Sequence, residues 1–305
     1  MLLGAQPGAC TVGELKATSM GDPKQYRCSC KKLIAQCPFW KEVTAAMSER
    51  GYRDFDITRA GTNISEIESP YIRRLLAPLQ RGPILESIRD VALAASPEWR
   101  GHLRETNRRN VDLIESLRVV TGAETIVDSS KLALRLKYLL RITDLDIKVV
   151  RVIRDGRAVS LTYTDEWNFA DAADPSLRGG GTGKQRPPPR RSMIEAAREW
   201  RRSNEAADSL IAQLSPEQWT KVRYEELCAE PEKTLERLLV FLGLDPTGMT
   251  MDYRSHGQHV IGNGMRMDST SEIRLDERWK SQLTLADLKT FDAVAGGLNR
   301  QYGYS

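Results

Sequence analysis

The chain has 305 residues, of which 40% are hydrophobic and 28% are charged. This length suits one globular domain over residues 1–305, because the only stretch of strongly shifted composition falls inside the apparent core. The 45 basic and 41 acidic side chains leave a net charge of +4, which is too balanced to favour a nucleic-acid partner.

Targeting signals and membrane segments are not evident in the sequence. No run of about 18 apolar residues occurs, so we expect no membrane span. The first residues lack the basic start and long apolar run of a signal peptide. Five cysteines, an odd number, do not resemble the disulfide framework of a secreted protein. We therefore expect a cytoplasmic location, and the sequence gives no indication of oligomeric state.

The N-terminal third is predicted to be mainly helical. Residues 38–50 have apolar side chains at helical spacing and end before Gly51. Residues 71–95 form a helical region that prolines interrupt. A long helix over 103–120 should end near Gly122.

The centre of the chain changes to strands separated by helices. Short apolar runs at 125–130 and 147–153 flank a helical segment at 132–142, which predicts a βαβ unit with parallel strands. Further elements are expected at 219–223 (strand), 231–242 (helix) and 285–298 (helix). The fold class predicted is α/β, with a three-layer parallel sheet flanked by helices.

Residues 170–192 are rich in Gly, Pro and Arg and bury too little apolar surface to order themselves. We interpret them as a flexible insertion. Within them, 179–184 looks like a phosphate-binding loop, but Arg178 and Gln185 stand where that motif needs Gly and Ser or Thr. Three prolines follow where a helix should begin, so this interpretation is rejected.

The segment 148–162 carries the main functional signal. Arg154 lies at the carboxyl end of an apolar strand, where α/β folds bind ligands. Asp155 can cap the next helix and Gly156 permits a sharp turn. A guanidinium there can hold a phosphate bidentately, and the Thr162 hydroxyl can donate to the same anion. The alternative is that Arg154 pairs with a carboxylate and Thr162 only packs.

The motif Arg154-Asp-Gly-Arg-Ala-Val-Ser-Leu-Thr162 resembles the 3′-phosphate-binding segment of sulfotransferases that use 3′-phosphoadenosine 5′-phosphosulfate (PAPS). It is most similar to the protein-tyrosine and carbohydrate branch and its bacterial relatives. In that family the Arg and a Ser eight residues later contact the 3′-phosphate, and Thr162 keeps the hydroxyl. Other segments that resemble the family are Leu3-Gly-Ala-Gln-Pro7, Gly13-Glu-Leu15, Asp128-Ser-Ser-Lys131, Val222-Arg-Tyr-Glu-Glu-Leu227, Phe241-Leu-Gly-Leu244, Gly262-Asn-Gly-Met-Arg266 and Trp279.

The resemblance implies a P-loop-NTPase-like sulfotransferase fold and transfer of a sulfuryl group from PAPS to a hydroxyl or amine, with no metal required. It implies that Lys131 neutralises charge at the sulfonate, that Glu14 is the base, and that Arg266 reaches the 3′-phosphate from a closing loop. The plain alternatives are a solvated Lys131, a solvated Glu14 and a surface salt bridge at Arg266. A small-molecule, sugar, lipid or peptide acceptor is compatible with the sequence.

Three of the cysteines, Cys28, Cys30 and Cys37, are spaced by two and seven residues. A zinc site would need a fourth ligand, either Cys10 or a distant histidine. We interpret the cysteines as packing or a local clip and predict no metal site. His259 is expected to position its loop.

The family binds the 5′-phosphosulfate with a first strand and a Gly-rich loop, which the resemblance locates before Met1. Residues 3–7 are then expected to lie within the following helix, with the first strand missing. Either the native start lies upstream, or the protein is a truncated or degenerate sulfotransferase-like protein that binds nucleotide without catalysis. For these 305 residues we expect weak or no transfer and poor solubility. A nucleotide kinase is disfavoured, because neither a Walker loop nor a magnesium carboxylate is found.

Overall fold

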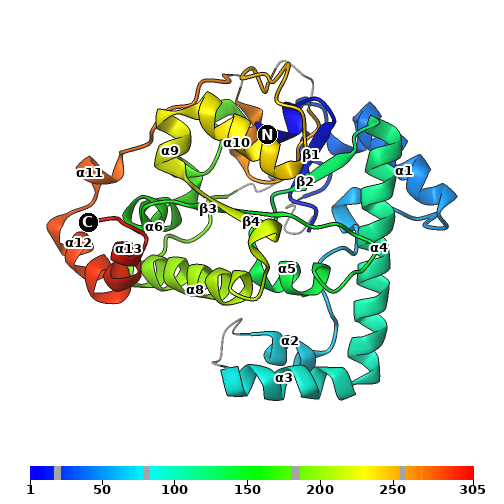
Figure 1. Ribbon diagram of the computed structural model, residues 1–305, viewed down its shortest axis with the longest axis horizontal. Helices are drawn as coiled ribbons and strands as arrows, with labels where there is room; N and C mark the ends of the chain where they lie inside the picture. The colour runs from blue at the N-terminus through cyan, green and yellow to red at the C-terminus, as the bar shows by residue number, and fades with distance from the viewer. Residues whose placement is uncertain (17–21, 78–82, 180–185, 255–257, 269) are drawn as a thin grey trace.

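The computed structural model describes residues 1–16, 22–77, 83–179, 186–254, 258–268 and 270–305. Within these residues the fold is α/β (Figure 1). The strands are β1 Ala9–Gly13, β2 Thr125–Asp128, β3 Val149–Ile153 and β4 Trp219–Arg223. The α-helices are α1 Pro38–Glu49, α2 Pro70–Leu76, α3 Pro83–Ala95, α4 Pro97–Thr121, α5 Ala133–Leu139, α6 Gly156–Thr164, α7 Glu166–Phe169, α8 Met193–Ile211, α9 Tyr224–Ala229, α10 Pro231–Leu242, α11 Trp279–Gln282, α12 Leu285–Phe291 and α13 Gly297–Gln301.

The strands form parallel pairs, but β2 and β3, the two strands of the predicted βαβ unit, do not pair with each other. β1 pairs with β2, and β3 pairs with β4 in an unbroken register from Val149 opposite Trp219 to Ile153 opposite Arg223. In the described part of the chain these are two separate two-stranded ladders, not one continuous sheet. In Figure 1 the β3–β4 pair crosses the middle of the molecule, with α8 below it and α9 and α10 above, and the β1–β2 pair lies to its upper right. The carboxyl ends of each pair therefore present two loops side by side.

The first residues differ from the prediction. Residues 3–7 do not lie within a helix: Leu3–Ala5 is a single 3-10 turn, and the chain then enters strand β1. Gly4 packs so closely on Thr11 that a Cβ would lie 2.4 Å from its side chain. Gly13 has a φ of 84°, and a Cβ there would meet the Ile261 carbonyl. Because these glycines lack a side chain, the backbone at Gly4 can pack against Thr11 and the backbone at Gly13 against Ile261, which positions β1.

The predicted helices are confirmed with shifted ends. Ser96 caps α4 by accepting a hydrogen bond from the Trp99 amide, and Gly122 ends it in the left-handed conformation. The final predicted helix, 285–298, is divided into α12, a π-helical turn Asp292–Gly296 and α13. The 19-residue helix α8, which the sequence analysis did not delimit, begins at a capping box formed by Ser192 and Glu195.

Buried side chains of the described residues gather in clusters that support the strand ends. One joins β1 to α1 and α4 through residues such as Val12, Trp40 and Leu113. A second lies among α2, α3, α4 and α5. A third joins α8 to the C-terminal helices around Trp200 and Phe291. The β1–β2 ladder is thus packed against helices distant in sequence, which holds its loops in place.

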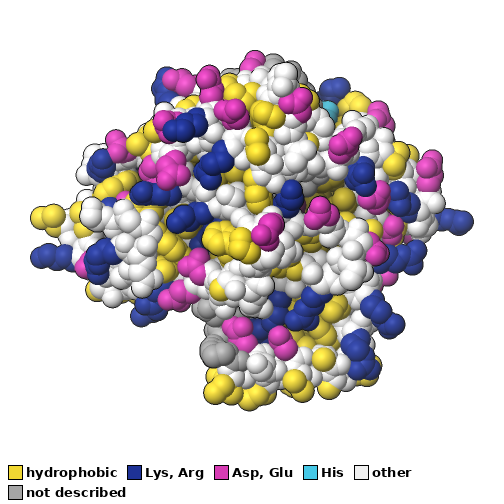
Figure 2. All heavy atoms as spheres, in the orientation of Figure 1, with side chains coloured by type: hydrophobic (Ala, Val, Ile, Leu, Met, Phe, Trp, Pro, Cys, Tyr) yellow, Lys and Arg dark blue, Asp and Glu magenta, His cyan; other side chains and the backbone are white. Residues whose placement is uncertain are grey.

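Helix α3 leaves an apolar face uncovered. Ile84, Ile88 and Val91, spaced like one helical face, are 75%, 60% and 70% exposed. Hydrophobic side chains line the lower edge of the molecule in Figure 2, where Figure 1 places α3. Among the described residues, no helix combines the length and apolar character needed to cross a membrane.

The segment 170–192 is described except for 180–185. Its first part folds back on the loop around residues 262–268: the Ala173 amide donates to Asp268 at 2.8 Å, and Ala172 is fully buried. A Cβ on Gly264 would overlap the Asp171 carboxylate. The phosphate-loop look-alike falls almost wholly outside the described residues. The flexible character of 170–192 as a whole stays a prediction, as does the single domain over 1–305.

Candidate active site

The loops that follow β1 and β2 are joined by the Asp128 carboxylate. Its Oδ1 accepts from the amides of Leu15 at 3.1 Å and Ser130 at 2.9 Å. Its Oδ2 accepts from Nε of Arg135 at 2.9 Å, and Arg135 is only 4% exposed. The Arg135 guanidinium also donates to Asn110 Oδ1 at 2.7 Å. One ionic network therefore fixes both strand ends against α4.

Glu14 and Lys131 meet between these two loops. The Lys131 Nζ lies 2.9 Å from Oε1 of Glu14, while the Nζ of Lys16 lies 3.2 Å from Oε2. The Glu14 side chain is 17% exposed and that of Lys131 is 70% exposed. The carboxylate is therefore held in a recess, with one cation on each oxygen, and the Lys131 ammonium reaches it from solvent. Two residues far apart in sequence, both candidates for catalysis, are brought together.

The turn between β3 and α6 is built as the sequence predicts. Asp155 caps α6 by accepting from the Arg157 amide at 2.9 Å. Gly156 has no room for a side chain, because a Cβ would lie within 3 Å of Trp200 and Phe291. Its amide donates to Oδ1 of Asn299 at 2.8 Å. The C-terminal helix therefore packs directly on the turn that carries Arg154.

Arg154 is held by a carboxylate, which was the alternative to a phosphate-binding role. Its Nη2 donates to Oδ2 of Asp276 at 3.0 Å and to the Asp276 carbonyl at 2.9 Å. The guanidinium lies over the Tyr224 ring, 4.4 Å from its centroid. Hydrogen bonds from Arg278 and Arg154 hold the pKa of the Asp276 carboxyl well below its usual range, against an opposing effect of burial. Asp276 is thus an anion at neutral pH, bound at Arg154.

The Thr162 hydroxyl donates to the Ala158 carbonyl at 3.2 Å, one turn earlier in α6. Among the contacts of the described residues, none joins Thr162 to Arg154, and none joins either of them to Glu14 or Lys131. The candidate residues therefore form two groups, one at each strand pair. The binding role predicted for Arg154 and Thr162 stays a prediction.

Arg266 has a different environment from the one predicted. It is 4% exposed, and its guanidinium donates to the carbonyls of Gly262, Asn263 and Arg27 at 2.5 to 2.7 Å. It also lies over the Tyr26 ring at 4.6 Å. Burial lowers its pKa from the ordinary arginine value. This geometry supports a role in holding the 262–266 loop and gives no support to direct contact with a phosphate.

Sequence reasoning did not find the partners of these residues. Asp276 and Arg135 were not singled out, because each meets its partner through the tertiary fold and no short motif contains both. His259 was expected only to position its loop, yet its ring lies against Cys28 and Cys37. The cysteine–histidine cluster and the pairs of Asp276 with Arg154 and of Arg135 with Asp128 form only when the fold brings distant segments into contact.

Comparison with known proteins identifies the family. The model for the family described as "Sulfotransferase family" matches residues 85–247, which is more than half of the chain. The chain belongs to the sulfotransferase family. The sulfotransferase match includes Lys131, Arg154 and Thr162, whereas Glu14 and Arg266 lie outside it.

Similar sulfotransferases include carbohydrate sulfotransferase 5 of Mus musculus and carbohydrate sulfotransferase 6 of Homo sapiens. Each is 27% identical over 167 residues, which cover 52% of this chain and 42% of the relative. The match therefore spans less than half the length of these relatives. Among solved structures, the sulfotransferase domain from the curacin biosynthetic pathway superposes with a TM-score of 0.44 and 12% identity, covering 97% of both chains.

Proposed function

We propose that the protein transfers a sulfuryl group from PAPS to a hydroxyl group of its acceptor. The observation that carries this proposal is the 2.9 Å contact of Glu14 with Lys131 at the carboxyl ends of β1 and β2. A base and a cation on adjacent strand ends are what transfer to a hydroxyl needs from the protein. Family membership supports sulfuryl transfer as the reaction class.

In the proposed reaction, Glu14 accepts the proton of the acceptor hydroxyl as its oxygen attacks sulfur. The bond from sulfur to the bridging oxygen breaks, and adenosine 3′,5′-bisphosphate leaves. Lys131 stabilises the negative charge that develops on the bridging oxygen. Because the Lys131 side chain is 70% exposed, it can leave Glu14 for the donor without unfolding its loop. Lys16 remains on the other carboxylate oxygen and keeps Glu14 oriented.

We assign the donor's 3′-phosphate to Arg154 and Thr162. The position of Arg154 after β3 and its stacking on Tyr224 support this assignment, since both orient a guanidinium at a strand end. In the structure Asp276 holds the same guanidinium group. Binding of a phosphate must then either displace this carboxylate or use the remaining donors of Arg154. Thr162 must turn its hydroxyl away from the Ala158 carbonyl.

The acceptor class we favour is a sugar hydroxyl, because the relatives named above are carbohydrate sulfotransferases. Small-molecule, lipid and peptide hydroxyls are the comparison set in an acceptor screen. The cytoplasmic location expected from the odd number of cysteines stays a prediction.

The test is transfer of radiolabelled sulfate from PAPS to a panel of sugars by the 305-residue chain, from which we expect weak activity. It is combined with calorimetric titration of adenosine 3′,5′-bisphosphate. We expect Arg154→Ala to weaken nucleotide binding by about 10- to 100-fold, the range for losing a charge-assisted hydrogen bond. Arg202→Ala is the matched control, because Arg202 is an exposed arginine paired with Glu199 on α8.

Unchanged nucleotide affinity in Arg154→Ala contradicts the assigned phosphate site. Nucleotide binding without any transfer, together with Glu14 and Lys131 variants that bind normally, indicates the non-catalytic nucleotide-binding alternative. Transfer that depends on both Arg154 and Glu14 supports the proposal as a whole.

A further inference from the structure

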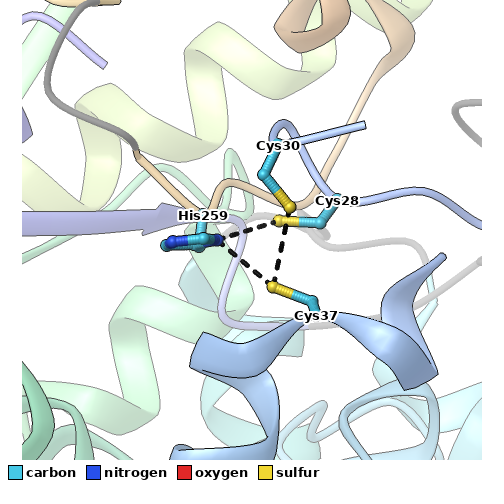
Figure 3. A group of neighbouring side chains, drawn as sticks. All are labelled: Cys28, Cys30, Cys37 and His259. Atoms are coloured by element: carbon cyan, nitrogen blue, oxygen red, sulfur yellow. Dashed lines mark hydrogen bonds between the residues drawn. The ribbon is translucent and has the colours of Figure 1, made fainter. Parts of the chain in front are cut away.

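A group of thiols and one imidazole lies apart from the residues assigned to transfer. Cys28, Cys30, Cys37 and His259 direct their side chains toward a common point (Figure 3). Their ligand-type atoms all lie within 4.8 Å of one another. Cys28 and Cys37 are fully buried. The cysteines come from the segment between β1 and α1, whereas His259 comes from a loop more than 200 residues later.

Three of the separations within this group are close to the edges of a small tetrahedron, and the remaining ones do not exceed 4.8 Å. The Sγ atoms of Cys30 and Cys37 are 3.7 Å apart, and Nδ1 of His259 lies 3.6 Å from Cys28 Sγ and 3.2 Å from Cys37 Sγ. Tetrahedral zinc with Zn–S bonds of about 2.3 Å and Zn–N bonds of about 2.0 Å sets its sulfurs about 3.8 Å apart and sulfur and nitrogen about 3.5 Å apart. These three separations fit a tetrahedral ion, and the wider ones need only small side-chain movements to close on it.

We propose that Cys28, Cys30, Cys37 and His259 bind one zinc ion as a structural Cys3His site. Three thiolates and one imidazole are soft ligands that favour zinc over magnesium or calcium. Four protein ligands complete the tetrahedron and leave no position for substrate or water, so the site is structural and takes no part in sulfuryl transfer.

The backbone around the cysteines has the form of a tight turn that presents two ligands. Arg27 and Leu33 form an antiparallel bridge, and inside it the Lys31 amide donates to the Cys28 carbonyl at 2.8 Å. Lys31 has a φ of 67° and is the one non-glycine residue with positive φ among the described residues. This conformation costs about 1 kcal/mol or more for a residue with a side chain. Binding of one ion by both Cys28 and Cys30 would offset the cost of this backbone conformation at Lys31.

His259 is oriented for the same purpose. The Phe39 ring stacks on the imidazole with centroids 4.7 Å apart and an interplanar angle of 4°. Next to it, the amide of Val260 donates to the Ser29 hydroxyl at 2.7 Å, and the Ser29 amide donates to the Val260 carbonyl at 3.2 Å. The ring is therefore fixed with Nδ1 toward the thiols. A disulfide between Cys30 and Cys37 would use two of these four groups and would leave Cys28 and His259 without a function.

The site would fasten together the two loops that flank β1. The loop of His259 continues to Ile261, whose amide donates to the Val12 carbonyl at 2.8 Å and whose carbonyl accepts from the Glu14 amide at 3.4 Å. The described residues 22–37 of the cysteine segment have little regular structure before α1. Zinc would supply the cross-link that this short, irregular segment lacks.

The primary test uses the unmodified chain. It is produced with zinc supplied, dialysed against metal-free buffer, and assayed for metal by mass spectrometry. We expect about one zinc per chain. Replacing zinc with Co²⁺ should give thiolate charge-transfer absorption together with the intense visible bands of a tetrahedral site. This measurement does not depend on whether any variant folds.

Variants then assign the ligands. Cys37→Ser and His259→Ala should lose most of the bound zinc, while Cys10→Ser and His102→Gln, which alter the same residue types elsewhere, should retain it. EDTA should lower the melting temperature of the native chain and of both controls, but not of the ligand variants. A folded chain with no zinc and no tetrahedral cobalt spectrum overturns the proposal. A Cys30–Cys37 disulfide in the purified chain, or an iron–sulfur chromophore, overturns it too. None of these readouts uses transfer activity.

Discussion

The Nη2 atom of Arg154 lies 3.0 Å from Oδ2 of Asp276. An aspartate is therefore paired with the guanidinium group that we propose binds the 3′-phosphate of PAPS. Both side chains are partly exposed, at 22% and 25%. A pair at this depth contributes modestly to stability, because water screens it. It is therefore weak enough for a doubly charged phosphate to compete with it.

Asp276→Asn should tighten the binding of adenosine 3′,5′-bisphosphate. The substitution keeps the shape of the side chain but removes the charge that competes for Arg154, and we expect the Kd to fall by about 3- to 10-fold, or roughly 1 kcal/mol. Calorimetric titration measures the change. Asp292→Asn is the control, since Asp292 is an exposed aspartate paired with Arg300. Weaker binding in Asp276→Asn would mean that the carboxylate orients Arg154 for the phosphate and does not compete with it.

The same aspartate predicts a pH dependence of stability. Arg278 and Arg154 lower the pKa of Asp276 in the folded protein, so the ionised carboxylate stabilises the fold at pH values above its unfolded pKa of about 3.9. This contribution is lost as the pH falls through the lower, folded pKa. Urea unfolding should show the native chain more stable than Asp276→Asn at pH 7, with the difference shrinking towards pH 3. A difference that does not vary with pH contradicts this interpretation.

The buried ionic network at the ends of β1 and β2 predicts a large loss of stability. Arg135→Met leaves Asp128, Asn110 and the Thr62 carbonyl without the donor that they share. We expect the free energy of unfolding to fall by about 3 kcal/mol, as when one partner of a buried ion pair is removed. Arg118→Met, which removes an exposed pair with Glu115 on α4, should cost less than about 1 kcal/mol. Urea unfolding of both variants makes the comparison, and similar losses would sink the prediction.

The sequence predicted the elements that are determined by neighbouring residues in the chain, and it missed those that depend on tertiary contacts. The β3–α6 turn was predictable because an apolar β-branched run is followed at once by Asp155, which caps, and Gly156, which lacks a side chain. Strand β1 was not, because its residues Ala9–Gly13 are small and mixed, and they become a strand only by pairing with Thr125–Asp128. A short strand of this kind is determined by tertiary contacts.

The candidate site divides in the same way. The motif around Arg154 indicated a ligand site, but its partner Asp276 lies more than 100 residues away and belongs to no shared motif. Likewise, Cys28, Cys30 and Cys37 were interpreted as packing or a local clip because the sequence showed no evident fourth ligand, and His259 meets them only through the tertiary fold. Arg266 was expected at a phosphate because its loop resembles the loop that closes over the nucleotide in the family, and that role stays a prediction. In the structure its guanidinium donates to carbonyls of its own loop and of Arg27, which only the tertiary fold brings to it.

The Glu14–Lys131 pair predicts separable effects on catalysis and binding. Glu14→Gln keeps the size and hydrogen bonding of the side chain but cannot take the acceptor proton, so kcat for sulfuryl transfer should fall by about 100- to 10,000-fold. Nucleotide affinity should stay within about 2-fold of the native value, because Glu14 contacts the acceptor in our proposal. Lys131→Ala should also lower kcat, whereas Lys131→Arg should recover part of it by restoring the charge. Stability should change little in the Lys131 variants, since that side chain is 70% exposed. A Glu14→Gln enzyme with normal kcat would remove Glu14 from the mechanism while leaving the nucleotide site intact.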